Sequence, residues 1–187
     1  MVGIAYGEGQ EAWWQKRSRD LTPTQDQLKT WGDWPLAGGA GIFLRFIEEE
    51  LIPFIETHYQ ADPSNRALAG FSFGGLFAGF TLLQAQREFQ KFIISSPAIL
   101  WDASLLIKLE EEYSNANVAL PARVYFAIGE FEDATTILEP YKDFVLKLKS
   151  RGYQGLEVTD QILPGETHFT AFSQGLSRGL RFLFPRS

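Results

Sequence analysis

The sequence contains no cysteine and only two histidines. Without thiols, the chain can form neither disulfide bonds nor thiolate metal sites, and a cysteine nucleophile is excluded. Basic residues are also outnumbered, because 17 Lys and Arg stand against 23 Asp and Glu, which gives a formal net charge of −6 at pH 7. This charge repels a phosphate backbone on average and no basic stripe offsets it, so we expect no nucleic-acid partner.

Long apolar runs are missing as well. The amino terminus lacks the basic start and long apolar core of a signal peptide, and no stretch reaches the roughly 20 apolar residues that a membrane span needs. We therefore expect a cytoplasmic protein with no membrane partner. What the chain does have is 45% hydrophobic and 14% aromatic residues over 187 positions, which predicts one domain, residues 1–187, with a substantial core.

The most informative stretch surrounds Ser72. A short apolar run at 67–69 indicates a buried strand, and large apolar residues then recur at helical spacing, namely Leu76, Phe77, Phe80 and Leu83. Between them lies Gly70-x-Ser72-x-Gly74, the pattern of a nucleophile elbow, in which the serine is strained and the flanking glycines avoid collisions between Cβ atoms. We predict Ser72 as a nucleophile and the backbone N–H of Phe73 as one oxyanion donor. An ordinary glycine-rich turn is the alternative.

The segment before the elbow is less regular. A short buried strand is predicted at Met1–Tyr6, followed by a loop at Gly7–Gly39 that contains four of the five tryptophans. Their rings either close over the edge of a core or form an aromatic binding wall. Apolar periodicity then predicts a helix at about Gly41–Tyr59, bent at Pro53 because proline removes one backbone donor.

The segment after the elbow alternates strands with amphipathic helices. Strands are predicted at 92–95, 123–128 and 156–163, and helices at about 102–113, 139–151 and 170–184. This alternation predicts an α/β fold with a doubly wound, mostly parallel sheet, whose ligand site lies at the carboxyl ends of the strands. Two runs of glutamate, 48–50 and 110–112, indicate solvated helix faces.

A serine hydroxyl needs a base to become nucleophilic, and the base is usually a histidine held by a carboxylate. His168 follows the last predicted strand, at the correct end of the sheet. His58 lies near the end of an earlier predicted helix, where we expect it to face solvent without a catalytic role. Because the order along the chain in this fold is serine, acid, histidine, we predict His168 as the base.

The acid is expected just after the strand at 123–128, where three carboxylates compete: Glu130, Glu132 and Asp133. Glu132 is favoured, because a short turn after Gly129 is needed before a side chain can return towards the histidine. A dyad, in which a backbone carbonyl orients the histidine, is also chemically feasible.

These residues make the chain similar to the branch of the α/β-hydrolases that contains esterase D-like and enterochelin (catecholate siderophore) esterases. Five stretches carry the resemblance: Arg17 to Thr24, Gly38 to Tyr59, the elbow with Gly74-Gly75-Leu76, Ser95-Ser96-Pro97 with Trp101-Asp102, and Pro164 to His168. The resemblance implies Ser72 as nucleophile and His168 as base. It also implies a substrate site that includes Trp101, with Arg17 or Arg19 near an acidic or catecholate group.

The implied activity is that of a serine esterase that works through an acyl-enzyme, on siderophore-type or other aryl esters, without cofactor or metal. A thioesterase or acyltransferase would use the same residues, and a binding module without catalysis is the third alternative. Family members are longer at the amino terminus, where their first strands supply a second oxyanion donor. We therefore expect an unpaired sheet edge beside Ala67–Ala69, self-association through it and weakened activity.

Overall fold

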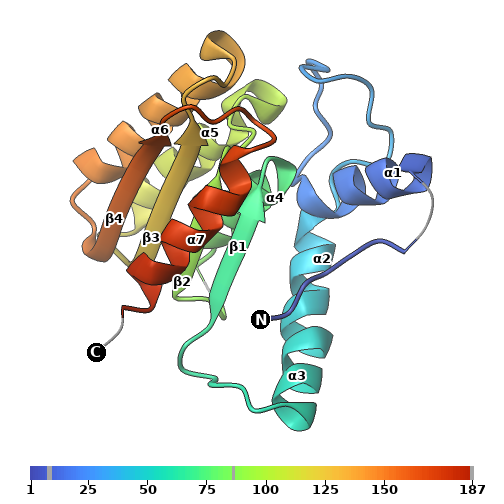
Figure 1. Ribbon diagram of the computed structural model, residues 1–187, viewed down its shortest axis with the longest axis vertical. Coiled ribbons are helices and arrows are strands. Elements are labelled where there is room, and N and C mark those ends of the chain that lie inside the picture. The colour runs from blue at the N-terminus through green and yellow to red at the C-terminus, as the bar shows by residue number, and fades with distance from the viewer. Residues whose placement is uncertain (8–9, 86, 186–187) are drawn as a thin grey trace.

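The computed structural model describes residues 1–7, 10–85 and 87–185. Within these residues, four strands form one parallel sheet in the order β1-β2-β3-β4 (Figure 1). Their bounds are Ala67–Phe71 for β1, Lys91–Ser95 for β2, Ala119–Gly129 for β3 and Gln154–Leu163 for β4. The parallel α/β sheet predicted from the sequence is therefore confirmed.

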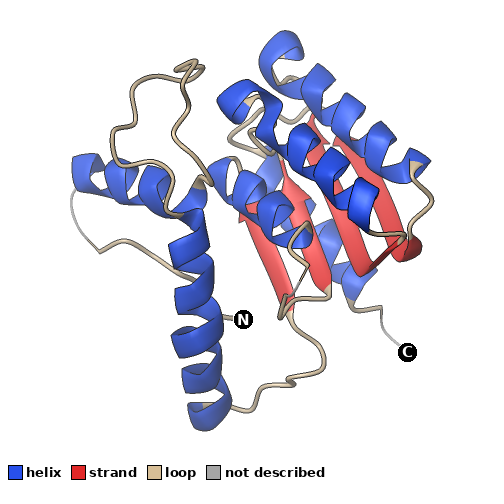
Figure 2. Cartoon of the chain, turned by 180° about the vertical axis from the view of Figure 1, so that it is seen from behind, coloured by secondary structure: helices blue, strands red, loops and turns tan. Residues whose placement is uncertain are grey.

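Helices cover both faces of this sheet (Figures 1 and 2). One face carries α4 (Phe73–Leu82), α5 (Trp101–Ala116) and α6 (Glu139–Ser150), and the other carries α7 (Ala171–Leu183). Successive side chains of a strand point to opposite faces. Accordingly, Phe92 and Ile94 of β2 belong to the core cluster beneath α4 to α6, whereas Ile93 belongs to the cluster beneath α7. This is the predicted doubly wound arrangement.

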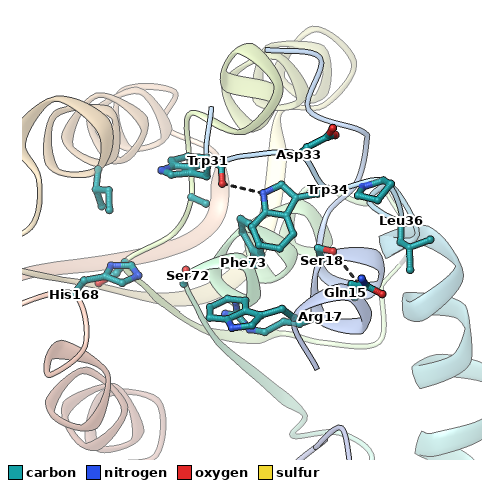
Figure 3. A pocket seen from close by; sticks show the side chains of 15 residues that line it. Gln15, Arg17, Ser18, Trp31, Asp33, Trp34, Leu36, Ser72, Phe73 and His168 are labelled. Atoms are coloured by element: carbon teal, nitrogen blue, oxygen red, sulfur yellow. Dashed lines mark hydrogen bonds between the residues drawn. The ribbon is translucent and has the colours of Figure 1, made fainter. Parts of the chain in front are cut away.

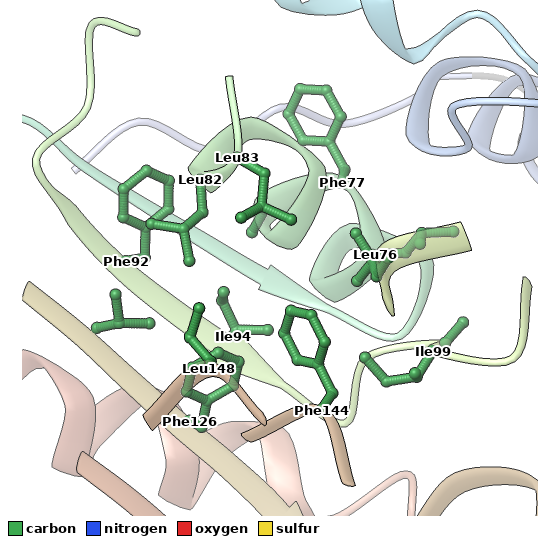
Figure 4. Packing of buried hydrophobic residues seen from close by; sticks show 14 of the residues in the cluster. Leu76, Phe77, Leu82, Leu83, Phe92, Ile94, Ile99, Phe126, Phe144 and Leu148 are labelled. Carbon is green, nitrogen blue, oxygen red and sulfur yellow. The ribbon is translucent and has the colours of Figure 1, made fainter. Parts of the chain in front are cut away.

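The larger cluster fills the space between the sheet and the three helices (Figure 4). Its largest aliphatic and phenyl side chains are fully buried, among them Leu76, Leu82, Phe92, Ile94, Phe126, Phe144 and Leu148. Burial of each such side chain contributes about 1.5–3 kcal/mol. This packing fixes the start of α4 relative to the carboxyl ends of the strands, where the candidate site lies.

The amino-terminal part is helical. α1 spans Gln10–Leu21, and α2 (Ala40–Phe46), the π-helical turn η1 (Ile47–Leu51) and α3 (Ile52–His58) follow one another as one rod. The rod contacts α4 through the Phe43 and Phe77 rings, whose centroids are 5.3 Å apart, and α3 stands apart from the sheet (Figure 1). None of the helices in the described parts of the chain is long and apolar enough to cross a membrane.

Two sequence-based predictions for the first 39 residues are wrong. Met1–Tyr6 is not a strand: its described backbone pairs with no other segment, and Met1, Val2 and Ile4 are exposed. The segment Gly7–Gly39 is not a continuous loop, because it contains α1. That helix lacks a regular apolar stripe, and what holds it is contact with α2 and α4.

The helix predicted at Gly41–Tyr59 is confirmed as α2, η1 and α3 in succession. Its irregular part is the π-helical turn η1, whereas Pro53, where a bend is expected from the sequence, lies at the start of α3. Only some of the apolar side chains of this helix are buried. Leu44 and Ile47 are buried, whereas Ile42, Phe46 and Phe54 are exposed. In the described residues β1 has a strand neighbour on one side only, so it is an edge strand, as expected.

The glutamate run at 110–112 was predicted to be solvated, and for Glu110 this is wrong. Its carboxylate is fully buried on α5 and accepts hydrogen bonds from Arg151 at 2.9 and 3.0 Å and from the Tyr153 hydroxyl at 2.8 Å. Burial and the neighbouring carboxylate raise the pKa of Tyr153 above its ordinary value. This cluster ties α5 to the end of α6 and is fully satisfied, which indicates a structural role.

Candidate active site

Ser72 occupies the tight turn between β1 and α4, with φ 59° and ψ −117°. Such a conformation costs a non-glycine residue on the order of 1–3 kcal/mol and persists only when the surroundings enforce it. Here the N–H of Ser72 donates to the carbonyl of Ser95 at 3.1 Å, and its carbonyl accepts from Leu76 at 2.9 Å and from Ala98 at 3.3 Å. The Ser72 side chain makes no capping bond to α4, so its hydroxyl stays available to the pocket.

The glycines around Ser72 do not share one role. A Cβ on Gly70 would lie 1.9 Å from the carbonyl oxygen of Gly74, so this glycine is required. A Cβ on Gly74 would meet nothing within 4 Å, which corrects the expectation that both motif glycines prevent collisions. The second close approach instead involves Gly75, whose Cβ would lie 2.8 Å from the Ser95 carbonyl oxygen and 2.9 Å from the Pro97 Cα.

His168 and Glu132 meet across the loops that follow β4 and β3. The distance from His168 Nδ1 to Glu132 Oε2 is 2.7 Å, and the Glu132 side chain is fully buried. Because an ionised carboxylate only accepts hydrogen bonds, Nδ1 carries the proton, and Nε2 is left as the basic nitrogen. Gly129 allows this approach, since a Cβ there would lie 2.6 Å from the Glu166 carbonyl oxygen.

The three competing carboxylates have separate partners. Glu130 accepts the backbone N–H of Gly165 at 2.8 Å and so ties the two loops together. Asp133 caps the π-helical turn η2 (Ala134–Leu138), and its bonds from Thr136 and, to a smaller extent, Thr135 hold the pKa of its carboxyl below the ordinary value. Glu132 alone among the three faces His168, as the turn-length argument expected.

Ser72 and His168 line the same cavity, which has a volume of about 570 Å³. Figure 3 shows Ser72 between His168 on one side and a wall rich in tryptophan on the other. No hydrogen bond between Ser72 and His168 is present in the described residues. The wall consists mainly of Trp14, Trp31, Trp34 and Phe73. Three of the four tryptophans of the amino-terminal segment therefore face the pocket, as an aromatic binding wall would. Trp31 and Trp34 also pack against the main core cluster, so both alternatives hold for these two rings.

Arg17 is the cation of this pocket. Its Nη2 donates to the carbonyl of Phe71 at 3.1 Å, and its guanidinium lies 5.4 Å from the ring centroid of Phe73 and 5.6 Å from those of Trp13 and Trp14. Burial lowers the pKa of this guanidinium from its ordinary value. It still carries its charge at neutral pH, because arginine is not deprotonated in proteins. The pocket therefore combines aromatic surface with the positive charge of Arg17 and with one carboxylate, that of Asp33, which pairs with Lys29 at 2.9 Å.

Two residues expected near the substrate lie elsewhere. Arg19 is exposed, pairs with Asp20 at 2.6 Å and does not line the cavity. Trp101 is fully buried: its ring stacks on Trp31 at 6.4 Å, and its Nε1 donates to the carbonyl of Thr24 at 3.1 Å. Trp101 thus supports the pocket wall from behind. From the sequence alone, a large aromatic side chain in a loop motif can line a pocket or support it from behind. Only the packing in the structure distinguishes these two positions.

One polar residue of the site was not singled out from the sequence. The hydroxyl of Ser96 donates to Glu132 Oε1 at 2.5 Å, and Ser96 also lines the cavity. Its signal was its place directly after β2, because the carboxyl ends of parallel strands collect functional side chains. His58, by contrast, lies exposed at the end of α3, with its Nδ1 2.8 Å from the carbonyl oxygen of Phe54.

A parallel, doubly wound sheet with a strained serine at a strand-to-helix turn defines the α/β-hydrolase class. The chain matches the family described as "Putative esterase" over residues 20–183, and it belongs to that family.

Individual relatives agree with this assignment. The chain is 34% identical to the ferri-bacillibactin esterase BesA of Bacillus subtilis (strain 168), over 97% of this chain and 66% of that protein. The solved structure of the BES protein from Bacillus cereus superposes with a TM-score of 0.81 at 30% identity, over 95% of this chain and 67% of that one. An IroE-like serine hydrolase from Shewanella oneidensis gives a TM-score of 0.80 at 29% identity, over 90% and 56%. The chain thus spans about two thirds or less of the length of these relatives.

Proposed function

We propose that this chain is a serine hydrolase that cleaves carboxylic esters through an acyl-enzyme, with Ser72 as nucleophile, His168 as base and Glu132 as acid. One observation carries the proposal: the buried Glu132 carboxylate binds His168 Nδ1 at 2.7 Å, in the cavity that Ser72 also lines. A histidine held in this way has the tautomer and orientation of a general base.

In the proposed first step, the Ser72 hydroxyl attacks the ester carbonyl carbon and His168 Nε2 takes its proton. The contact between these two groups closes in the substrate complex, since such bonds are often long in free enzymes. The oxyanion faces the start of α4, where the N–H of Phe73 is free of helical partners and the helix dipole favours negative charge. The carbon–oxygen bond to the alcohol then breaks, and His168 returns the proton to the leaving oxygen.

In the second step, water takes the place of the alcohol. His168 Nε2 accepts a proton from water as the water oxygen bonds to the acyl carbon, and the bond to Ser72 Oγ breaks as the proton returns to that oxygen. Glu132 remains ionised throughout and stabilises the positively charged ring.

For the substrate, we propose aryl-bearing esters of the siderophore type. The tryptophan-rich wall offers flat apolar surface, and Arg17 offers a charge that pairs with anionic groups and stacks on aromatic rings. The name of the relative BesA, a ferri-bacillibactin esterase, points in the same direction.

A thioesterase or acyltransferase would use the same nucleophile and base. A thioesterase differs from an esterase in the leaving group, and an acyltransferase differs in the acceptor of the acyl group. A silent binding module is a second candidate, because β1 is an edge strand in the described residues and only one oxyanion donor, the N–H of Phe73, is assigned here. Loss of one such donor costs on the order of a hundredfold or more in turnover.

A fluorophosphonate probe separates a serine enzyme from a silent binding module, because it modifies only an activated serine hydroxyl. We expect the 187-residue chain to be labelled and Ser72→Ala to lose the label, while Ser173→Ala, which changes an exposed serine of α7, keeps it. Turnover of p-nitrophenyl butyrate then tests ester cleavage directly. Labelling that persists in Ser72→Ala would reject this nucleophile, and a chain that is never labelled would support the binding module.

A further inference from the structure

We infer that Ser96 is a positioning residue for the proposed triad: its hydroxyl holds the Glu132 carboxylate in the orientation that receives His168. This inference rests on the proposed function and deepens it, because it adds a residue that acts on the reaction through the acid.

Both oxygens of the Glu132 carboxylate are occupied. Oε1 accepts the Ser96 hydroxyl at 2.5 Å and Oε2 lies 2.7 Å from His168 Nδ1, within a side chain that is fully buried. Hydrogen bonds to an ionised carboxylate are short and about twice as strong as neutral ones. A glutamate also has one more rotatable bond than an aspartate in the same role. The hydrogen bond from Ser96 to Oε1 therefore restricts rotation of the Glu132 carboxylate that the bond to His168 alone would still allow.

The position of Ser96 is itself enforced. Its φ is 42°, in the left-handed region that serine rarely adopts, and its N–H donates to the carbonyl of Ala127 at the end of β3 at 2.8 Å. The residue is almost completely buried. Strained backbone of this kind persists where the surrounding structure over-determines it. The sheet therefore fixes the direction of the Ser96 hydroxyl, and the contact with Glu132 does not depend on the motion of a free loop.

The last residue of β2 and the short loop after it also hold the nucleophile. The carbonyl of Ser95 accepts the N–H of Ser72, and the N–H of Ala98 donates to the carbonyl of Ser72. Backbone atoms of this loop thus fix the Ser72 turn, while a side chain of the loop fixes the acid. The loop after β2 sets the distance between the two ends of the proposed triad.

The chain offers a matched control for Ser96. Ser95 is equally buried, but its Oγ has no hydrogen-bond partner in the described residues and does not line the cavity. Ser95→Ala and Ser96→Ala therefore each remove one buried hydroxyl from adjacent positions, and only the second removes a bond to Glu132. Ser96→Gly supplies a second variant without the hydroxyl, in which a φ of 42° carries no strain.

The first measurement is steady-state turnover of p-nitrophenyl butyrate. We expect Ser96→Ala and Ser96→Gly to lower kcat by roughly ten- to hundredfold, the range for loss of a hydrogen bond to a charged group, with KM unchanged. Ser95→Ala should match the wild type. In a Glu132→Ala background, Ser96→Ala should cost nothing further, because a residue that acts through Glu132 has no effect once that carboxylate is gone.

The second measurement does not depend on turnover. The chain has only two histidines, so the ring-nitrogen NMR shifts of His168 are readily assigned with His58→Gln. We expect these shifts to move in Ser96→Ala and to stay in place in Ser95→Ala. The inference is overturned if Ser96→Ala and Ser96→Gly leave the His168 shifts and kcat unchanged. It is also overturned if Ser96→Ala lowers kcat by the same factor with and without Glu132. If Ser72→Ala keeps full activity, it is the proposed function that fails.

Discussion

The two glycines of the Gly70-x-Ser72-x-Gly74 motif should respond oppositely to alanine. At Gly70 the new methyl group would lie 1.9 Å from the carbonyl oxygen of Gly74, which is backbone and cannot rotate away. Relief requires β1 and the first turn of α4 to separate by more than 1 Å. At Gly74 the methyl group would enter open space, on a residue that already lies within α4.

The magnitudes follow from this geometry. Overpacking costs 1–3 kcal/mol even where side chains can give way, so we expect Gly70→Ala to lose about 3 kcal/mol or more. For a chain of this size, that lowers Tm by roughly 6–12 °C. Gly74→Ala reduces the freedom of the unfolded chain and favours the helix, so it should gain about 0.5–1 kcal/mol and raise Tm by roughly 1–4 °C.

Thermal unfolding followed by circular dichroism measures both changes, and the rate of fluorophosphonate labelling shows whether Ser72 has moved. Gly70→Ala should lose labelling together with stability, whereas Gly74→Ala should keep both. If Gly74→Ala were the more damaging variant, the turn would not have the geometry described and the argument from Cβ collisions would be refuted.

Two further pairs of variants test the base and the pocket cation. His168→Ala should reduce turnover of p-nitrophenyl esters nearly as much as Ser72→Ala, with no added loss in the double variant, while His58→Ala stays close to the wild type; a crippling His58→Ala would contradict this. Arg17→Ala should weaken kcat/KM for anionic aryl esters relative to small neutral ones by roughly three- to thirtyfold, while Arg19→Ala leaves that ratio unchanged; an equal loss for both ester types would assign Arg17 a structural role.

The sequence predicts those features that local rules determine. The elbow is readable because a strand, a glycine turn and a helix follow one another within 16 residues. His168 and the carboxylates after Gly129 were found because parallel strands bring their carboxyl ends to one edge. The choice of Glu132 rested on turn length, and the structure places that side chain against His168.

Features that depend on contacts between distant segments could not be predicted. Ser96 meets Glu132 across 36 positions, and the buried Glu110 meets Arg151 across 41. The place of Ser96 directly after β2 indicates the site but not the partner of its hydroxyl, and no local pattern distinguishes Glu110 from a solvated residue. The helix α1 was missed because it lacks an apolar stripe, and the buried position of Trp101 depends on its stacking against Trp31.

The two edges of the sheet differ in a way that bears on association. β4 carries charged side chains, among which Glu157 pairs with Arg123 at 2.8 Å and Asp160 pairs with Lys149. Charges of this kind block edge-to-edge pairing. β1 carries only alanine, leucine, glycine and phenylalanine, and its free edge faces no other strand in the described residues. Exposed Ile42, Phe46 and Phe54 on the neighbouring rod add apolar surface.

We therefore expect the 187-residue chain to self-associate through β1 in the micromolar to millimolar range. Ala69→Lys places a charge on an exposed position of that strand and should keep the chain monomeric, whereas Gln154→Lys, on the exposed start of β4, should not. Sedimentation velocity over a concentration series distinguishes the three chains. The physical reason is that the outer edge of β1 leaves backbone N–H and C=O groups without a strand partner, and a second chain can pair with them. A wild-type chain that sediments as a monomer at every concentration, with the same behaviour in Ala69→Lys, would show that the β1 edge is not a pairing surface.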